Sequence, residues 1–122
     1  MEPIDVDAAL SDIDEQWSPR TAARVDDHAL KLARVEGEFV WHSHPDADEL
    51  FLVRDGELTV QFRDAADATL SPGDALRVPA GVEHRPVADE EATILLFETA
   101  ETTNTGDADT DEFDETTGEH LD

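Results

Sequence analysis

Six apolar segments of strand length follow one another between residues 28 and 98, and turn signals separate them. The segments are HALKLARV, EFVWHSH, ELFLV, ELTVQF, ALRVP and ATILLFE. The turn signals are Gly37, Pro45-Asp46, Asp55-Gly56, Ser71-Pro72-Gly73 and Ala80-Gly81. Closely spaced strands joined by tight turns are typical of an all-β sandwich or barrel. A chain of 122 residues, 39% of them hydrophobic, suffices for one domain with a core and is too short for two.

The residues on either side of this β region divide the chain into three parts. Residues 1–20 carry a weak helical pattern that stops at WSPR, where Pro19 restricts the residue before it. Residues 1–27 are therefore predicted to form an N-terminal segment that is helical or extended. Residues 28–100 are the predicted barrel. Residues 101–122 consist mostly of Thr, Asp, Glu, Asn and Gly, so they are predicted to form a flexible acidic tail.

The charge is strongly negative, with 32 Asp and Glu against 8 Lys and Arg and a formal net charge of −24. Such a surface repels phosphate backbones and anionic membranes, which argues against nucleic-acid and membrane partners. The acids are spread along the whole chain and Lys31 is the sole lysine, a pattern that resembles halophilic cytosolic proteins. The alternative is a mesophilic protein with an acidic tail.

The N-terminus lacks the basic flank and apolar core of a signal peptide. The longest apolar runs, such as ATILLF, are far too short to cross a bilayer. A cytoplasmic location is therefore expected. Because cysteine is absent, thiolate metal sites and disulfides are excluded.

Two histidines stand one residue apart in the segment GEFVWHSH. On a strand, His42 and His44 point to the same face, which apolar Val40 shares and which is therefore predicted to be the inner one. Glu49 has the wrong parity for a straight strand, but PDAD at 45–48 breaks the strand, and a neighbour starting there can face the histidines. Two imidazoles and a carboxylate suit a divalent first-row metal. A single buried histidine is more often a hydrogen-bonded core residue.

A second piece of the pattern is GDALRVPAGVEH, from Gly73 to His84. Two turns flank the short strand ALRV, and His84 opens the next strand, where it could supply a third imidazole. Together the two pieces read G-x4-H-x-H-x4-E-x6-G and G-x5-P-x-G-x2-H. This spacing resembles both motifs of the cupin superfamily, with one residue fewer after Gly37 and no asparagine closing the second motif.

The resemblance covers about residues 28–98. It implies a double-stranded β-helix, the jelly-roll-like cupin barrel, in which His42, His44, Glu49 and His84 bind one metal. A closer resemblance is to small single-domain cupins that contain WSP, GEFVWHSH, DELF, VP.GVEHRP and a late NTGD, and that often carry a sugar-phosphate-isomerase-like label. The corresponding positions here are Trp17–Pro19, 37–44, 48–51, 78–86 and Asn104–Asp107.

The metal could be Fe, Mn, Zn, Ni or Cu, and open coordination positions permit oxygenase, isomerase or lyase chemistry on a small molecule. The resemblance permits Glu49 to double as a catalytic base. The alternative is a non-catalytic cupin that binds a metal or small ligand as a sensor or assembly protein. Cupins commonly pair, so a homodimer is expected, and the parity of Phe39 and Trp41 places them on an outer face suited to it. Deleting residues 101–122 is expected to leave the metal site intact.

Overall fold

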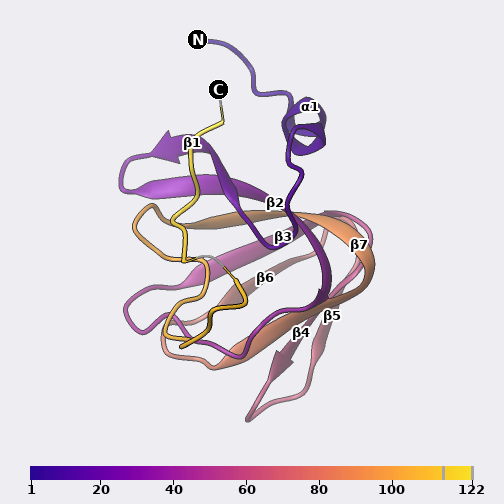
Figure 1. Ribbon diagram of the computed structural model, residues 1–122, viewed down its shortest axis with the longest axis vertical. Helices are drawn as coiled ribbons and strands as arrows, with labels where there is room; N and C mark the ends of the chain where they lie inside the picture. Colours follow the sequence, from indigo (N-terminus) through magenta and orange to yellow (C-terminus); the bar gives the residue numbers. More distant parts are fainter. Residues whose placement is uncertain (114, 122) are drawn as a thin grey trace.

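The computed structural model describes residues 1–113 and 115–121. One short helix precedes a barrel of antiparallel strands (Figure 1). The elements are α1 (Val6–Ser11), β1 (Arg20–Val25), β2 (His28–Glu38), β3 (Glu49–Asp55), β4 (Leu58–Phe62), β5 (Ala68–Leu70), β6 (Ala75–Val78) and β7 (His84–Thr99). The prediction of an all-β barrel with a short N-terminal helical segment is confirmed.

The long strand β7 connects the two layers of the barrel. Its C-terminal part lies between β2 and β3, where Ile94 pairs with Ala33 on one side and Val53 on the other. Its N-terminal part pairs with β4, with Arg85 opposite Gln61. β2 pairs with β7 on both sides of a shift in register at residues 35–37, while the other neighbour of β7 changes from β3 to β4. One strand can therefore take part in both layers and close the barrel.

The core consists of alternate residues of these strands, as the two-residue period of a strand requires. Among the described residues, fourteen buried ones form one cluster, which includes Val35, Phe51, Val53, Ile94 and Leu96. Burying each aliphatic or aromatic side chain of this size contributes about 1.5–3 kcal/mol.

The turn between β3 and β4 needs a glycine. A Cβ added at Gly56 would lie 2.9 Å from both the Cα and the Cβ of Ala92, and φ at Gly56 is +83°. The barrel wall thus approaches this turn too closely for any side chain.

Helix α1 packs against the outside of the barrel. Asp5 caps it by accepting a hydrogen bond from the backbone N–H of Ala8 at 3.1 Å. Leu10 and, just after the helix, Ile13 bury themselves against Leu32 of β2. Among the described residues, the structure has no helix long and apolar enough to span a membrane.

The segment after β2 differs from the prediction. Residues 39–48 run as irregular chain instead of a strand, so strand parity does not decide where their side chains point. Phe39 is buried in the core, where its ring stacks on Trp17 with centroids 5.0 Å apart. The prediction that Phe39 lies on an outer face is therefore wrong. Trp41 is half-buried beneath the guanidinium group of Arg63.

The acidic C-terminal segment also makes more contacts than its composition suggests. Residues 101–113 and 115–121 form no helix or named strand but follow the barrel closely (Figure 1). The N–H of Thr21 donates to the carbonyl of Glu119 at 2.8 Å, and the N–H of Leu121 donates to the carbonyl of Thr21 at 3.0 Å. Phe113 packs on Phe39 with ring centroids 4.6 Å apart. Backbone pairing along the edge strand β1, which hydropathy does not report, explains this difference.

Candidate metal centre

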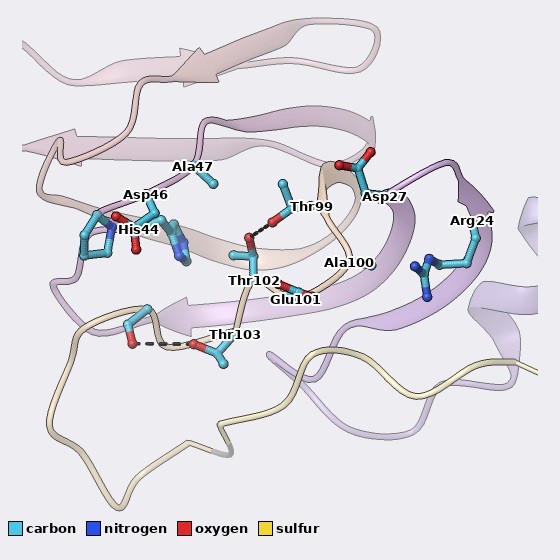
Figure 2. Close-up of a pocket in the computed structure, with 12 residues that line it drawn as sticks. Arg24, Asp27, His44, Asp46, Ala47, Thr99, Ala100, Glu101, Thr102 and Thr103 are labelled. Atoms are coloured by element: carbon cyan, nitrogen blue, oxygen red, sulfur yellow. Dashed lines mark hydrogen bonds between the residues drawn. The ribbon is translucent and has the colours of Figure 1, made fainter.

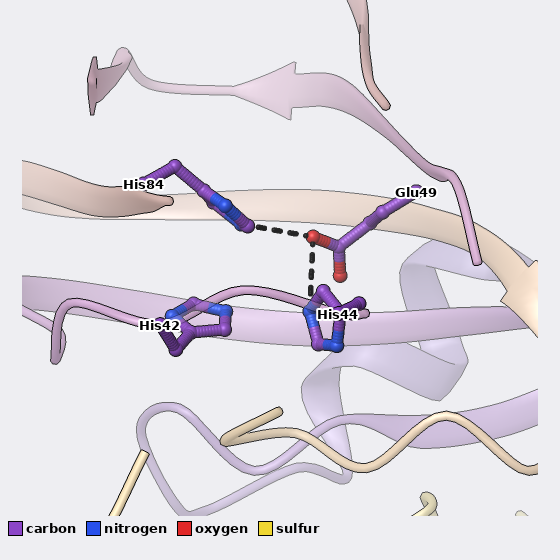
Figure 3. Close-up of side chains that lie close together, drawn as sticks. All are labelled: His42, His44, Glu49 and His84. Atoms are coloured by element: carbon purple, nitrogen blue, oxygen red, sulfur yellow. Dashed lines mark hydrogen bonds and ion pairs between the residues drawn. The ribbon is translucent and has the colours of Figure 1, made fainter. Parts of the chain in front are cut away.

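The structure brings together the four side chains that the sequence motifs single out. His42, His44, Glu49 and His84 are all buried, and one potential ligand atom from each lies within 4.8 Å of the others. Figure 3 shows the three imidazoles and the carboxylate converging on one another. The two N-terminal histidines come from irregular chain, whereas Glu49 and His84 are the first residues of β3 and β7.

Backbone hydrogen bonds explain why residues so far apart in sequence meet here. The N–H of His42 donates to the carbonyl of His84 at 3.0 Å, and the N–H of His84 donates to the carbonyl of His42 at 2.9 Å. This isolated antiparallel bridge places the two imidazoles side by side, with ring centroids 4.4 Å apart. The N–H of Gly81, in the turn of the second motif, donates to the carbonyl of His44 at 3.0 Å. The second motif is thereby attached to the first.

Two of the imidazoles have a fixed orientation. His42 Nδ1 donates to the carbonyl of Val40 at 2.9 Å, and His84 Nδ1 donates to the carbonyl of Val82 at 2.8 Å. A carbonyl only accepts, so each Nδ1 carries its proton and each Nε2 faces the cluster. Hydrogen bonding of the remote ring nitrogen is the usual way in which proteins orient a metal-binding histidine.

Burial, followed by the nearby His84, lowers the pKa of His42 to about 4. This imidazole is therefore neutral at physiological pH and has a lone pair available for a metal ion. Metal binding there requires no proton to leave.

Glu49 lies next to two of the three imidazoles. Its Oε1 is 3.2 Å from His84 Nε2 and 3.4 Å from His44 Nε2. Burial alone would raise the pKa of Glu49, but the two imidazoles outweigh it and hold the pKa at about 2. Glu49 is thus a buried carboxylate, and a positive charge beside it would be favourable.

His44 supports the same interpretation. Its Nε2 is buried and has no hydrogen-bond partner among the described residues, although Glu49 is near. Buried polar atoms without partners are rare in folded proteins and call for an explanation such as an ion. Three imidazole nitrogens and one carboxylate oxygen are the donor set that first-row divalent metals prefer, so the residues fit a transition metal.

Behind the site, the barrel also holds a buried Lys–Glu pair that the motifs do not include. Lys31 Nζ lies 3.8 Å from Glu98 Oε1, and both side chains are almost completely buried. Leu50 pairs with Phe97, so the next position along both strands sets Glu98 opposite Glu49. Burial and the charge of Glu49 raise the pKa of Glu98 to about 8, and burial lowers that of Lys31. The inward parity of both residues in HALKLARV and ATILLFE is the signal that could have revealed them.

A surface cleft of about 470 Å³ adjoins the cluster at His44 (Figure 2). Residues 99–103, at the end of β7 and in the turn after it, line this cleft between Asp46 at one end and Arg24 at the other (Figure 2). Inside the barrel, in contrast, a cavity of only about 20 Å³ lies beside His42 and Glu49. There is room for a small molecule outside the cluster and for no more than a water-sized group within it.

Comparison with known proteins places the same region in one family. Residues 31–98 match the sequence profile of Cupin_2, the cupin domain, which covers more than half of the chain. The uncharacterised protein YdbB of Bacillus subtilis (strain 168) is 41% identical over 78 residues, which are 64% of this chain and 69% of YdbB.

Solved structures agree with this match. A cupin-2 domain protein of Shewanella frigidimarina is 45% identical, with a TM-score of 0.76 over 79% of this chain and 93% of that one. Hydroquinone 1,2-dioxygenase of Sphingomonas sp. TTNP3 superimposes with a TM-score of 0.67 over 78% of this chain and 71% of that one. Its 19% identity makes it a likeness of fold alone. The predicted double-stranded β-helix is thereby confirmed.

Proposed function

Because the chain belongs to the Cupin_2 family, we propose that it is a small metal-binding cupin whose barrel holds one divalent transition metal. The proposed ligands are His42, His44, Glu49 and His84. One observation carries this proposal: four buried donors from three parts of the chain lie within 4.8 Å of one another. Without a cation, such a cluster concentrates polar atoms in a core at a considerable desolvation cost.

We further propose that the protein is an enzyme acting on a small molecule. A bound metal would supply Lewis-acid or redox chemistry at an open coordination position. The protein's own contribution is to keep two imidazoles in a fixed tautomer and to keep Glu49 ionised. Glu49 is also the proposed catalytic base, because it is the one carboxylate among the four proposed ligands. The cleft beside His44 is the proposed place for the substrate.

A second candidate function is non-catalytic binding of a metal or small ligand. The specific observation that favours it is the small cavity of about 20 Å³ beside His42 and Glu49, since an enzyme needs its substrate to reach the metal. Oxygenase, isomerase and lyase chemistry remain open within the first proposal. The fold shared with a hydroquinone dioxygenase favours none of them, because related folds host many reactions.

Metal content tests the proposal. We expect protein purified without chelator and then dialysed to retain about one iron, manganese, zinc, nickel or copper per chain. His84→Ala removes one ligand of four and should lower metal affinity by orders of magnitude, while the far-UV spectrum stays that of a β protein. His28→Ala is the matched control, because His28 is not one of the four clustered residues and its ring stacks on exposed Phe97. Equal metal content in all three proteins, or none in the wild type, would contradict the proposal.

A further inference from the structure

The segment Asn104–Asp107 lies directly against the two histidines that come from irregular chain. We propose that this turn is a clamp on residues 42–44, and that Asp107 is a positioning residue that keeps His42 and His44 in metal-binding geometry. This inference rests on the proposed metal site. It replaces the expectation that the C-terminal segment can be removed without affecting metal binding.

Asp107 binds Ser43, the residue between the two histidines. Its Oδ1 accepts from the backbone N–H of Ser43 at 2.6 Å, and its Oδ2 accepts from the Ser43 hydroxyl at 2.9 Å. Its own N–H donates to the carbonyl of Ser43 at 3.0 Å. The N–H of Ser43 belongs to the peptide plane shared with His42, and its carbonyl belongs to the plane shared with His44. Asp107 therefore holds the backbone on both sides of Ser43, and with it the Cα positions of both histidines.

The preceding residue, Gly106, leaves no room for a side chain beside the imidazoles. A Cβ added at Gly106 would lie 2.2 Å from the carbonyl oxygen of Ser43, 3.1 Å from His42 Cδ2 and 3.1 Å from His44 Nδ1. Only the bare backbone of a glycine fits this space. Gly106 also lines the cleft beside His44.

The clamp is braced on its other side. Asn104 Nδ2 donates to the carbonyl of Trp17 at 2.8 Å, and the N–H of Asn104 donates to the carbonyl of Thr116 at 2.7 Å. Thr105 is completely buried, and its carbonyl accepts from the N–H of Ala108 at 2.9 Å. Because these contacts hold the turn in place independently of Ser43, the turn can restrain the backbone of Ser43.

The two groups of ligands explain why a clamp is needed. Glu49 and His84 begin strands, so ladder hydrogen bonds fix their backbones. His42 and His44 lie in irregular chain and have no strand ladder of this kind. The backbone of His42 is bound by its bridge to His84, and the carbonyl of His44 accepts from the N–H of Gly81. Groups that orient metal ligands from outside the coordination shell typically contribute about 10- to 100-fold to metal affinity.

The test compares Asp107→Ala with Asp109→Ala, which removes the same charge from an exposed residue two positions further on. Zinc affinity is measured by chelator competition, and the imidazole resonances of the metal-free proteins are recorded by NMR. We expect Asp107→Ala to weaken zinc binding about 10- to 100-fold and to shift or broaden the rings of His42 and His44 while His28 stays unchanged. Asp107→Asn keeps one carbonyl acceptor for the Ser43 N–H and should restore part of the affinity. Asp109→Ala should match the wild type.

Wild-type zinc affinity in Asp107→Ala, or an equal loss in Asp109→Ala, would overturn the inference. If Asp107→Ala does not fold, Gly106→Ala decides the same question, because its Cβ would force the turn away from Ser43. A wild type that binds no zinc would instead refute the proposed function. In that case the NMR comparison still decides whether Asp107 orders the two imidazoles.

Discussion

At the scale of single residues, Glu98 and Lys31 form a buried pair whose pKa values depend on Glu49 of the candidate site. Two carboxylates, Glu49 and Glu98, lie opposite each other inside the barrel, and the sole lysine of the chain lies 3.8 Å from the second of them. Like charges that face each other across strands are destabilising. Because Glu49 is held ionised by the imidazoles, Glu98 is the carboxyl that gains a proton.

This arrangement predicts that the protein loses stability as pH rises, and that Glu98→Gln removes this loss. The pKa of Glu98 is raised from 4.5 to about 8 on folding, so the folded state binds more protons than the unfolded state between these values. As pH rises through this window, the free energy of unfolding of the metal-free wild type should therefore fall. The contribution of Glu98 alone is up to about 1.4 kcal/mol per pH unit. Glu98→Gln should gain stability relative to the wild type as pH rises from 5 to 8.

Urea unfolding at pH 5, 6.5 and 8 measures this difference. Glu90→Gln, which removes an exposed carboxylate from the same strand, is the control and should run parallel to the wild type. Parallel curves for Glu98→Gln would show that Glu98 does not take up a proton on folding.

At the scale of elements, the sequence predicts most strands but not all of their boundaries. Apolar alternation and turn residues locate β3, β4, β6 and the apolar half of β7. The polar run ADEE at 88–91 hides the continuity of β7 from His84 to Thr99, and β5 has three residues, too few to show a period. Strand parity fails in residues 39–48, because their positions depend on contacts with His84 and Asp107 that local sequence does not encode.

For the candidate site too, the sequence predicts some features and not others. Motif spacing is sufficient to select His42, His44, Glu49 and His84, because turn residues and the order of the strands fix where those side chains meet. The roles of Ser43 and the Asn104–Asp107 turn could not be predicted from composition. Thr, Asn, Asp and Gly contact the barrel through hydrogen bonds and close backbone approach, which a hydropathy pattern does not register.

At the scale of the whole molecule, the net charge of −24 dominates the electrostatics. Surface ion pairs such as Arg34–Glu91 and Arg85–Glu38 engage basic residues on the barrel, but eight Lys and Arg cannot compensate 32 acids. Exposed pairs of this kind contribute about 0–1 kcal/mol each. Repulsion among the remaining carboxylates is therefore expected to limit stability at low ionic strength.

Salt should consequently stabilise the fold. Lowering potassium chloride from 1 M to 0.1 M lengthens the Debye length from about 3 Å to about 10 Å, so repulsion reaches more neighbouring charges. We expect the melting temperature to fall with this change, as halophilic adaptation requires. Differential scanning calorimetry of the same sample at both concentrations checks this, and an unchanged melting temperature would count against halophilic adaptation.

The central claim is that three imidazoles and one carboxylate of the barrel form a metal centre. X-ray absorption spectroscopy of the wild-type protein loaded with one equivalent of zinc examines that ligand shell directly. The account predicts ligands at about 2.0–2.2 Å and the multiple-scattering signature of about three imidazole rings. A shell of oxygen atoms without imidazole scattering would place the metal on acidic side chains elsewhere in the chain and would contradict the account.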